Sequence, residues 1–189
     1  SRVIDKRYNL IVEKKDEFIE NFKAAITSTV KSISNTDEVE VTFGNDLLKT
    51  EKTIIRLPEV KSFKNKIDYL QARACADSAS LQLRYSDDQI LKSFEPKGII
   101  SKKLYKIAEK VRYEKIGTEE FTGIKNNILK YYSKRMNELD LKDSKETIFE
   151  AFENYLRKNI FDIENNNEIE KSFKKLKKSF DKKLNKKIN

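Results

Sequence analysis

The sequence feature that most constrains the fold is an uninterrupted helical stretch at residues 67–85. It contains no glycine or proline, and alanine, serine and a single cysteine dominate its middle. Because glycine and proline are the residues that most destabilise a helix interior, this composition predicts one long helix. Small side chains allow a second helix to approach closely, so we expect this helix to occupy a central position.

A second amphipathic helix is predicted at residues 101–116, after a break at Pro96 and Gly98 and before Gly117. Its apolar residues recur at spacings of three and four, which places them on one helical face. They are Ile100, Leu104, Ile107, Ala108 and Val111. We therefore predict that residues 66–128 form a central helical hairpin.

The flanking sequence predicts further helices and one pair of strands. A helix is expected from about Lys15 to Ile33, and two more are expected to begin near Thr118 and Asp143, where capping residues precede apolar repeats. Apolar and polar residues alternate at 38–43, and residues 53–57 are rich in β-formers. We predict that these strands pair as a β-hairpin at about residues 38–57.

Together these elements predict a mostly α fold, a single helical domain with a central helical hairpin and one small β-hairpin. The domain is expected to cover residues 15–164, with an arm at residues 1–14 and a Lys-rich amphipathic helix at residues 165–189. Only four glycines and two prolines occur among 189 residues, which favours long helices over a turn-rich sandwich.

The positive charge is concentrated in the C-terminal segment. Residues 165–189 contain nine lysines and three acidic residues, so they carry +6 of the net charge of +9. Phe173, Leu176, Phe180 and Leu184 recur at helical spacing, which predicts that this helix packs on the domain. The alternative is an anion-binding module in which the basic amphipathic helix binds nucleic acid or a membrane surface.

The residue types present exclude several classes of enzyme site. The chain has no histidine, which excludes Ser-His-Asp and Cys-His catalytic sites and histidine-containing zinc sites. Its one cysteine, Cys75, cannot form an internal disulfide and fits a reducing cytosol. The four glycines do not form a phosphate-binding loop of the form G-x-x-x-x-G-K-[ST]. We therefore expect no ATP hydrolysis by this chain alone.

Six charged residues of the two central helices are the candidate structural or partner-binding residues: Arg73, Asp77, Arg84, Glu109, Arg112 and Glu114. Spacings of three and four residues allow salt bridges along each helix on a solvated surface. Alternatively, these residues form a partly buried network between the helices, face a partner, or contact a substrate or metal. We favour the network because arginine makes bidentate ion pairs, and we predict that Arg73, Asp77 and Arg112 share it.

Two sequence blocks resemble the amino-terminal region of CobT, a subunit of the aerobic cobaltochelatase of cobalamin biosynthesis. The first is Glu-Val-Glu-Val-Thr-Phe at residues 38–43, and the second is Glu-x-x-Arg-x-Glu-x-Ile-Gly at residues 109–117. Shorter matches lie in order between and beyond these blocks, so the resemblance covers about residues 22–128.

The resemblance implies a non-catalytic interaction domain that docks on a CobS-like AAA+ ATPase during ATP-dependent cobalt insertion into a corrin precursor. A CobN-like large subunit would bind the corrinoid and cobalt, and the CobS-like ring would bind ATP. We therefore expect no cofactor and no metal in this chain. The resemblance also implies a bacterial, cytoplasmic protein, and we expect neither a membrane span nor a nucleic-acid partner.

Residue 1 is serine rather than methionine, so we expect the chain to be a trimmed piece or fragment. The resemblance implies that longer CobT members continue into an acidic linker and a von Willebrand factor A domain. We therefore expect this chain to be the amino-terminal piece of such a protein, or a shortened relative.

Overall fold

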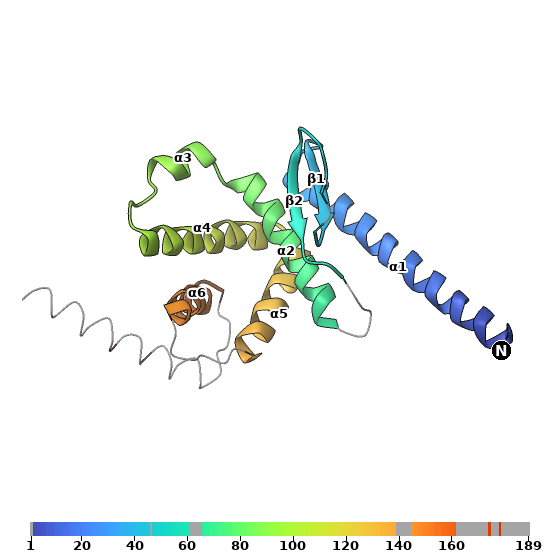
Figure 1. The fold of residues 1–189 in the computed structure, drawn as a ribbon. Coiled ribbons are helices and arrows are strands. Elements are labelled where there is room, and N and C mark those ends of the chain that lie inside the picture. The colour runs from blue at the N-terminus through green and yellow to red at the C-terminus, as the bar shows by residue number, and fades with distance from the viewer. Residues whose placement is uncertain are drawn as a thin grey trace, which may run out of the picture. The chain divides into compact units, whose positions relative to one another are not determined.

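The structure is a computed structural model that describes residues 2–45, 47–60, 66–138 and 145–161, together with Lys174 and Lys178. Within these residues the chain forms six helices and one two-stranded sheet (Figure 1). The mostly helical fold predicted from the sequence is therefore confirmed. The chain divides into two compact units, Ser1–Arg84 and Tyr85–Asn189.

Helix α1 (Arg2–Ser34) opens the first unit and is longer than predicted. The segment at residues 2–14, expected as an irregular arm, continues the helix that the apolar repeat predicted only from about Lys15. Leu10 and Ile11 in the N-terminal third of this helix are about half exposed, in keeping with the lack of a regular apolar stripe in that part of the sequence. The helix ends at Ser34, and the next residue, Asn35, has a φ of 57°, a left-handed conformation that asparagine tolerates well.

Strands β1 (Val39–Phe43) and β2 (Thr53–Leu57) form where the sequence predicted them, but they pair in parallel rather than as a hairpin. Val39 lies opposite Thr53, and Phe43 lies opposite Leu57. Residues 44–52 lie between the strands, and about nine extended residues can span roughly 30 Å, nearly twice the length of a five-residue strand. The connection can therefore return the chain to the start of β1.

Polar contacts hold this return connection beside β1. The Thr50 hydroxyl donates to a Glu40 carboxylate oxygen at 3.3 Å, and Lys52 Nζ donates to the Asp37 carbonyl at 3.2 Å. The turn out of β1 uses Gly44 at a φ of +64°, a conformation that most residues other than glycine and asparagine adopt only with strain. Gly44 is therefore the residue that starts the crossover.

The core of the first unit joins α1, the sheet and helix α2 (Lys66–Tyr85). Ile26 and Val30 of α1 are fully buried against Val39 of β1, and the small residues Ala72 and Ala76 of α2 belong to the same cluster. The alanines allow this close approach, as the small residues of this stretch predicted. The buried part of the α1 stripe ends near Phe22, and Phe18 is 54% exposed.

The second unit contains four helices: α3 (Asp88–Ser93), α4 (Ile99–Glu120), α5 (Thr122–Glu138) and α6 (Lys145–Phe161). Helix α4 packs against both α5 and α6. The sequence predicted that α4 would stop at Gly117, but the helix continues through this buried glycine to Glu120. Tertiary packing outweighs the unfavourable helix propensity of glycine, which is only about 1 kcal/mol.

The central helical hairpin was predicted to pair α2 with α4. These two helices belong to different units, so their pairing stays a prediction. The single domain expected at residues 15–164 also stays a prediction. The aromatic and leucine residues of the predicted C-terminal helix, Phe173 to Leu184, lie outside the described residues.

Candidate functional site

In the first unit, the structure brings together two of the predicted charged residues. Arg73 Nε lies 3.3 Å from the carboxylate of Asp77, one helical turn further along α2. Asp77 is fully buried, whereas a third of the Arg73 side chain is exposed. Arg73 also donates to the Thr29 hydroxyl of α1 at 3.4 Å, and Arg84 donates to the Ile33 carbonyl at 3.2 Å. Both arginines therefore connect α2 to α1.

In the second unit, Glu109 and Arg112 of α4 form a bidentate ion pair. Arg112 Nε and Nη2 lie 2.6 and 2.7 Å from the two carboxylate oxygens of Glu109. Glu109 also accepts a 2.6 Å hydrogen bond from the Ser86 hydroxyl, and Arg112 donates to the Tyr85 carbonyl at 2.8 Å. The pair thereby anchors the chain that enters the second unit. The predicted link from Arg112 to Arg73 and Asp77 stays a prediction.

Hydrogen bonding explains the electrostatic state of this pair. The bonds from Arg112 lower the pKa of Glu109 below its ordinary value, although partial burial opposes ionisation. The same bonds raise the pKa of Arg112. A carboxylate with a lowered pKa is a poor general base near neutral pH, so this pair is suited to structure rather than proton transfer.

The sixth predicted residue, Glu114 of α4, belongs to a buried ionic cluster that the sequence did not reveal. Its carboxylate lies 2.5 Å from Arg157 Nη1 of α6, and both side chains are fully buried. Arg157 also donates through Nε and Nη2 to Glu153 at 3.0 and 2.8 Å. The Arg157 guanidinium stacks 3.3 Å from the ring centroid of Tyr132 on α5. One arginine thus joins α4, α5 and α6.

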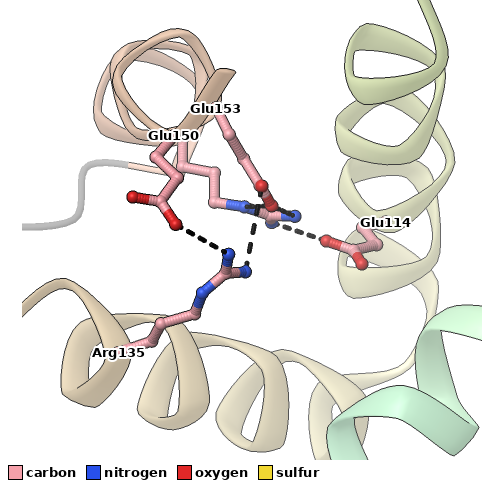
Figure 2. Close-up of polar contacts among 5 residues, drawn as sticks. Glu114, Arg135, Glu150 and Glu153 are labelled. Atoms are coloured by element: carbon pink, nitrogen blue, oxygen red, sulfur yellow. Dashed lines mark hydrogen bonds and ion pairs between the residues drawn. The ribbon is translucent and has the colours of Figure 1, made fainter. Parts of the chain in front are cut away.

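A second, more exposed arginine forms the edge of this cluster. Arg135 of α5 lies 4.0 Å from Glu150 and 3.9 Å from Glu153, both of α6 (Figure 2). Figure 2 shows Glu114 entering from its own helix, so that the charged groups converge from three helices. These longer and partly solvated pairs are weaker than the buried contacts of Arg157.

The cluster shifts the pKa values of its members. Burial opposes the ionisation of Glu153, but the positive charges of Arg157, Lys110 and Arg135 hold its pKa below the ordinary value. Burial, reinforced by the negative charge of Glu114, raises the pKa of Tyr132 well above its ordinary value. Burial likewise disfavours charge on Arg157, yet Glu114, Tyr132 and Glu153 raise its pKa. The arginine is therefore held charged in the interior.

Arg157 and Glu153 were not predicted from the sequence, because the apolar repeat alone indicated which face of α6 is buried. The apolar repeat that predicts this helix is Ile148, Phe149, Phe152, Tyr155, Leu156 and Ile160. Of these, Tyr155 and Ile160 are 45% and 36% exposed. The available signal was the four-residue spacing of Glu153 and Arg157 beside an apolar stripe, which allows an ion pair to face the core. An ion pair on the surface has the same spacing, so the spacing alone does not distinguish a buried ion pair from an exposed one.

The structure also reveals a group of exposed apolar side chains in the second unit. Ile90 of α3, Phe94 after it, and Ile99 and Ile100 of α4 are all more than half exposed. No residue of α3 is buried. Among the residues that the structure describes, no group of three or more acidic or cysteine side chains is placed to hold a metal ion.

A comparison with protein families identifies the chain. A family model described as cobalamin biosynthesis protein CobT matches residues 16–186. The chain belongs to the CobT family. The match confirms the resemblance seen at about residues 22–128. It extends the resemblance at both ends, and toward the C-terminus it also covers the rest of α5 and all of α6. The Arg157 cluster therefore lies wholly within the CobT-family region.

CobT-family membership places the chain in cobalamin biosynthesis, in the context of a chelatase complex. No solved structure matches the chain significantly. None of the described helices combines the length and apolar character needed to cross a membrane.

Proposed function

We propose that this chain is a non-catalytic interaction domain of a cobaltochelatase, and that it docks on a CobS-like AAA+ ATPase. In this proposal the ATPase ring binds and hydrolyses ATP, and a CobN-like large subunit binds cobalt and the corrin precursor. The observation that carries the proposal is the CobT family match, which covers most of the chain.

The chemistry of the described residues supports a binding role. The carboxylates of the two best-defined polar clusters, Glu109 and Glu153, are paired with arginines that lower their pKa values. Such groups hold helices together but are poorly suited to accept a proton near neutral pH. The sequence of this chain also contains no glycine-rich phosphate-binding loop.

The buried cluster supports the same role in a second way. Arg157 ties α4, α5 and α6 together through Glu114, Glu153 and Tyr132. A group of helices fixed in this way presents its outer surfaces with little internal freedom, which lowers the ordering cost of binding a large partner.

The first test is activity of the purified 189-residue chain. Alone it should neither hydrolyse ATP nor insert cobalt into a corrin precursor. Mixed with the CobS-like ATPase of the same organism, it should co-elute with the ring in size-exclusion chromatography when ATP is present. ATP hydrolysis that stays proportional to this chain through successive purification steps would contradict the non-catalytic role. If the chain does not co-elute with the ring with ATP, with ADP or without nucleotide, the docking role is contradicted.

A further inference from the structure

Four large apolar side chains are exposed over a short part of the second unit. Ile90 is 58% exposed, Phe94 is 74% exposed, Ile99 is 88% exposed and Ile100 is 57% exposed. We call residues 87–102, which comprise α3, the connection and the first turn of α4, the α3–α4 tip. In Figure 1, α3 and α6 lie on opposite sides of α4. Exposed apolar side chains that adjoin one another commonly mark a binding surface.

Local hydrogen bonds and one ion pair stabilise the two ends of the tip. The Asp87 carboxylate caps α3 by accepting from the backbone N–H groups of Gln89 at 2.8 Å and Ile90 at 3.1 Å. At the other end, Lys102 Nζ lies 2.8 Å from the Glu95 carboxylate, and the Lys102 N–H donates to the Gly98 carbonyl at 2.8 Å. The apolar side chains therefore project from an ordered backbone, which reduces the entropy lost on binding.

Charged groups of both signs surround the apolar side chains. Asp87, Asp88 and Glu95 are acidic, and Lys92, Lys97 and Lys102 are basic, so the tip has no net charge. Lys92 and Lys97 are exposed and lie within three residues of Phe94. The hydrogen bond from Lys102, with the positive charges of Lys102, Lys106 and Lys92, lowers the pKa of Glu95 despite some desolvation. Exposed lysines therefore precede and follow Phe94 in the sequence.

We propose that the α3–α4 tip is the surface through which this chain docks on its protein partner. Phe94 and Ile99 would enter an apolar pocket on the partner, and carboxylates bordering that pocket would face Lys92 and Lys97. This inference rests on the proposed function, because it assigns the docking role to one surface.

The charge distribution favours a protein over an anionic membrane or nucleic acid. Binding to those polyanions depends on excess positive charge, whereas the tip carries three acidic and three basic residues. A protein partner can instead supply opposite charges at each position, together with a pocket for the central aromatic side chain.

The experiment measures the affinity of the full chain for the CobS-like ATPase by biolayer interferometry in the presence of ATP. Phe94→Ser and Ile99→Ser should each weaken binding by about 30-fold, the loss typical of a central interface residue, and the double variant should weaken it further. The matched control is Leu47→Ser, because Leu47 is 84% exposed in the other unit and should bind like wild type. Lys97→Glu should slow association, whereas Lys125→Glu on α5 should not.

The outcomes separate the two proposals. If wild type binds and the Phe94/Ile99 double variant binds within about twofold of the Leu47 control, the tip is not the docking surface and the proposed function stands. If wild type does not bind the ATPase, both proposals fail. Circular dichroism of each variant should match wild type, because the altered side chains are exposed.

Two other occupants of the tip are tested with the same variants. Sedimentation with mixed phosphatidylcholine–phosphatidylserine vesicles tests a membrane, and light scattering of the chain alone tests a second copy. Vesicle binding or self-association that Phe94→Ser abolishes, with ATPase binding unchanged, would overturn the assignment to a protein partner.

Discussion

Arg157 provides the sharpest test of how the second unit is held together. Its guanidinium lies 2.5 Å from Glu114 and 2.8 Å from Glu153, and the whole side chain is buried. Two unit charges about 4 Å apart attract by ~4 kcal/mol at an effective dielectric constant of ~20. Replacing Arg157 with methionine keeps an unbranched side chain but leaves buried negative charge without this cation. Removing one partner of a buried ion pair costs about 3–5 kcal/mol, so we expect Arg157→Met to lose that amount of stability.

Arg135→Met is the matched control, because it removes a guanidinium from the same cluster. The Arg135 side chain is 37% exposed, and its ion pairs measure 3.9 and 4.0 Å. Solvent screening limits such pairs to about 1 kcal/mol or less. In urea unfolding followed by circular dichroism, an m value of about 2 kcal/mol/M predicts that Arg157→Met lowers the midpoint by about 1.5–2.5 M. The control should lower it by no more than about 0.5 M.

The dependence on pH gives a second readout. In the wild type the pKa of Glu153 is lowered, so its stabilising contribution is complete above the ordinary carboxyl pKa and is lost as pH falls through the folded value. In Arg157→Met, burial without the guanidinium should raise that pKa instead. The folded variant then binds a proton more readily than the unfolded variant does. The loss in free energy of unfolding relative to wild type should therefore shrink as pH falls from about 7 to about 5. Equal midpoints for the two arginine variants, with no change in the deficit with pH, would refute this account.

Three other perturbations test the structure with the same unfolding assay. Gly44→Ala should cost about 1–2 kcal/mol because of its φ of +64°, whereas Gly123→Ala, whose new methyl would meet no atom within 4 Å, should be neutral or slightly stabilising. Glu109→Gln should reduce stability at neutral pH, and the difference from wild type should disappear as pH falls through the lowered pKa of Glu109, because the wild-type contribution exists only while this carboxyl is ionised. Asp77→Ala should cost roughly 3 kcal/mol, because it leaves Arg73 without its carboxylate partner in α2; a loss below about 1 kcal/mol would show that exposure of Arg73 relieves the penalty.

Local sequence patterns determined most of the secondary structure of this protein. The stretch without glycine or proline at residues 67–85 is helical, and the alternation of Val39, Val41 and Phe43 marks a strand. These patterns work because helix and strand periodicities are set by the backbone over a few neighbouring residues. Two specific sequence blocks also indicated the CobT family, to which the matched region of the chain belongs.

The tertiary structure decided which side of each element is buried and how the elements pair. Residues 53–57 could pair with β1 in either direction, and the long return connection produces the parallel arrangement. On α6, the sequence favoured Tyr155 and Ile160 as buried residues, yet Glu153 and Arg157 are buried instead. A buried arginine needs carboxylate partners, and one of those on Arg157, Glu114, lies on another helix 43 residues distant in sequence. Such long-range complementarity has no local signature, so only the folded chain reveals it.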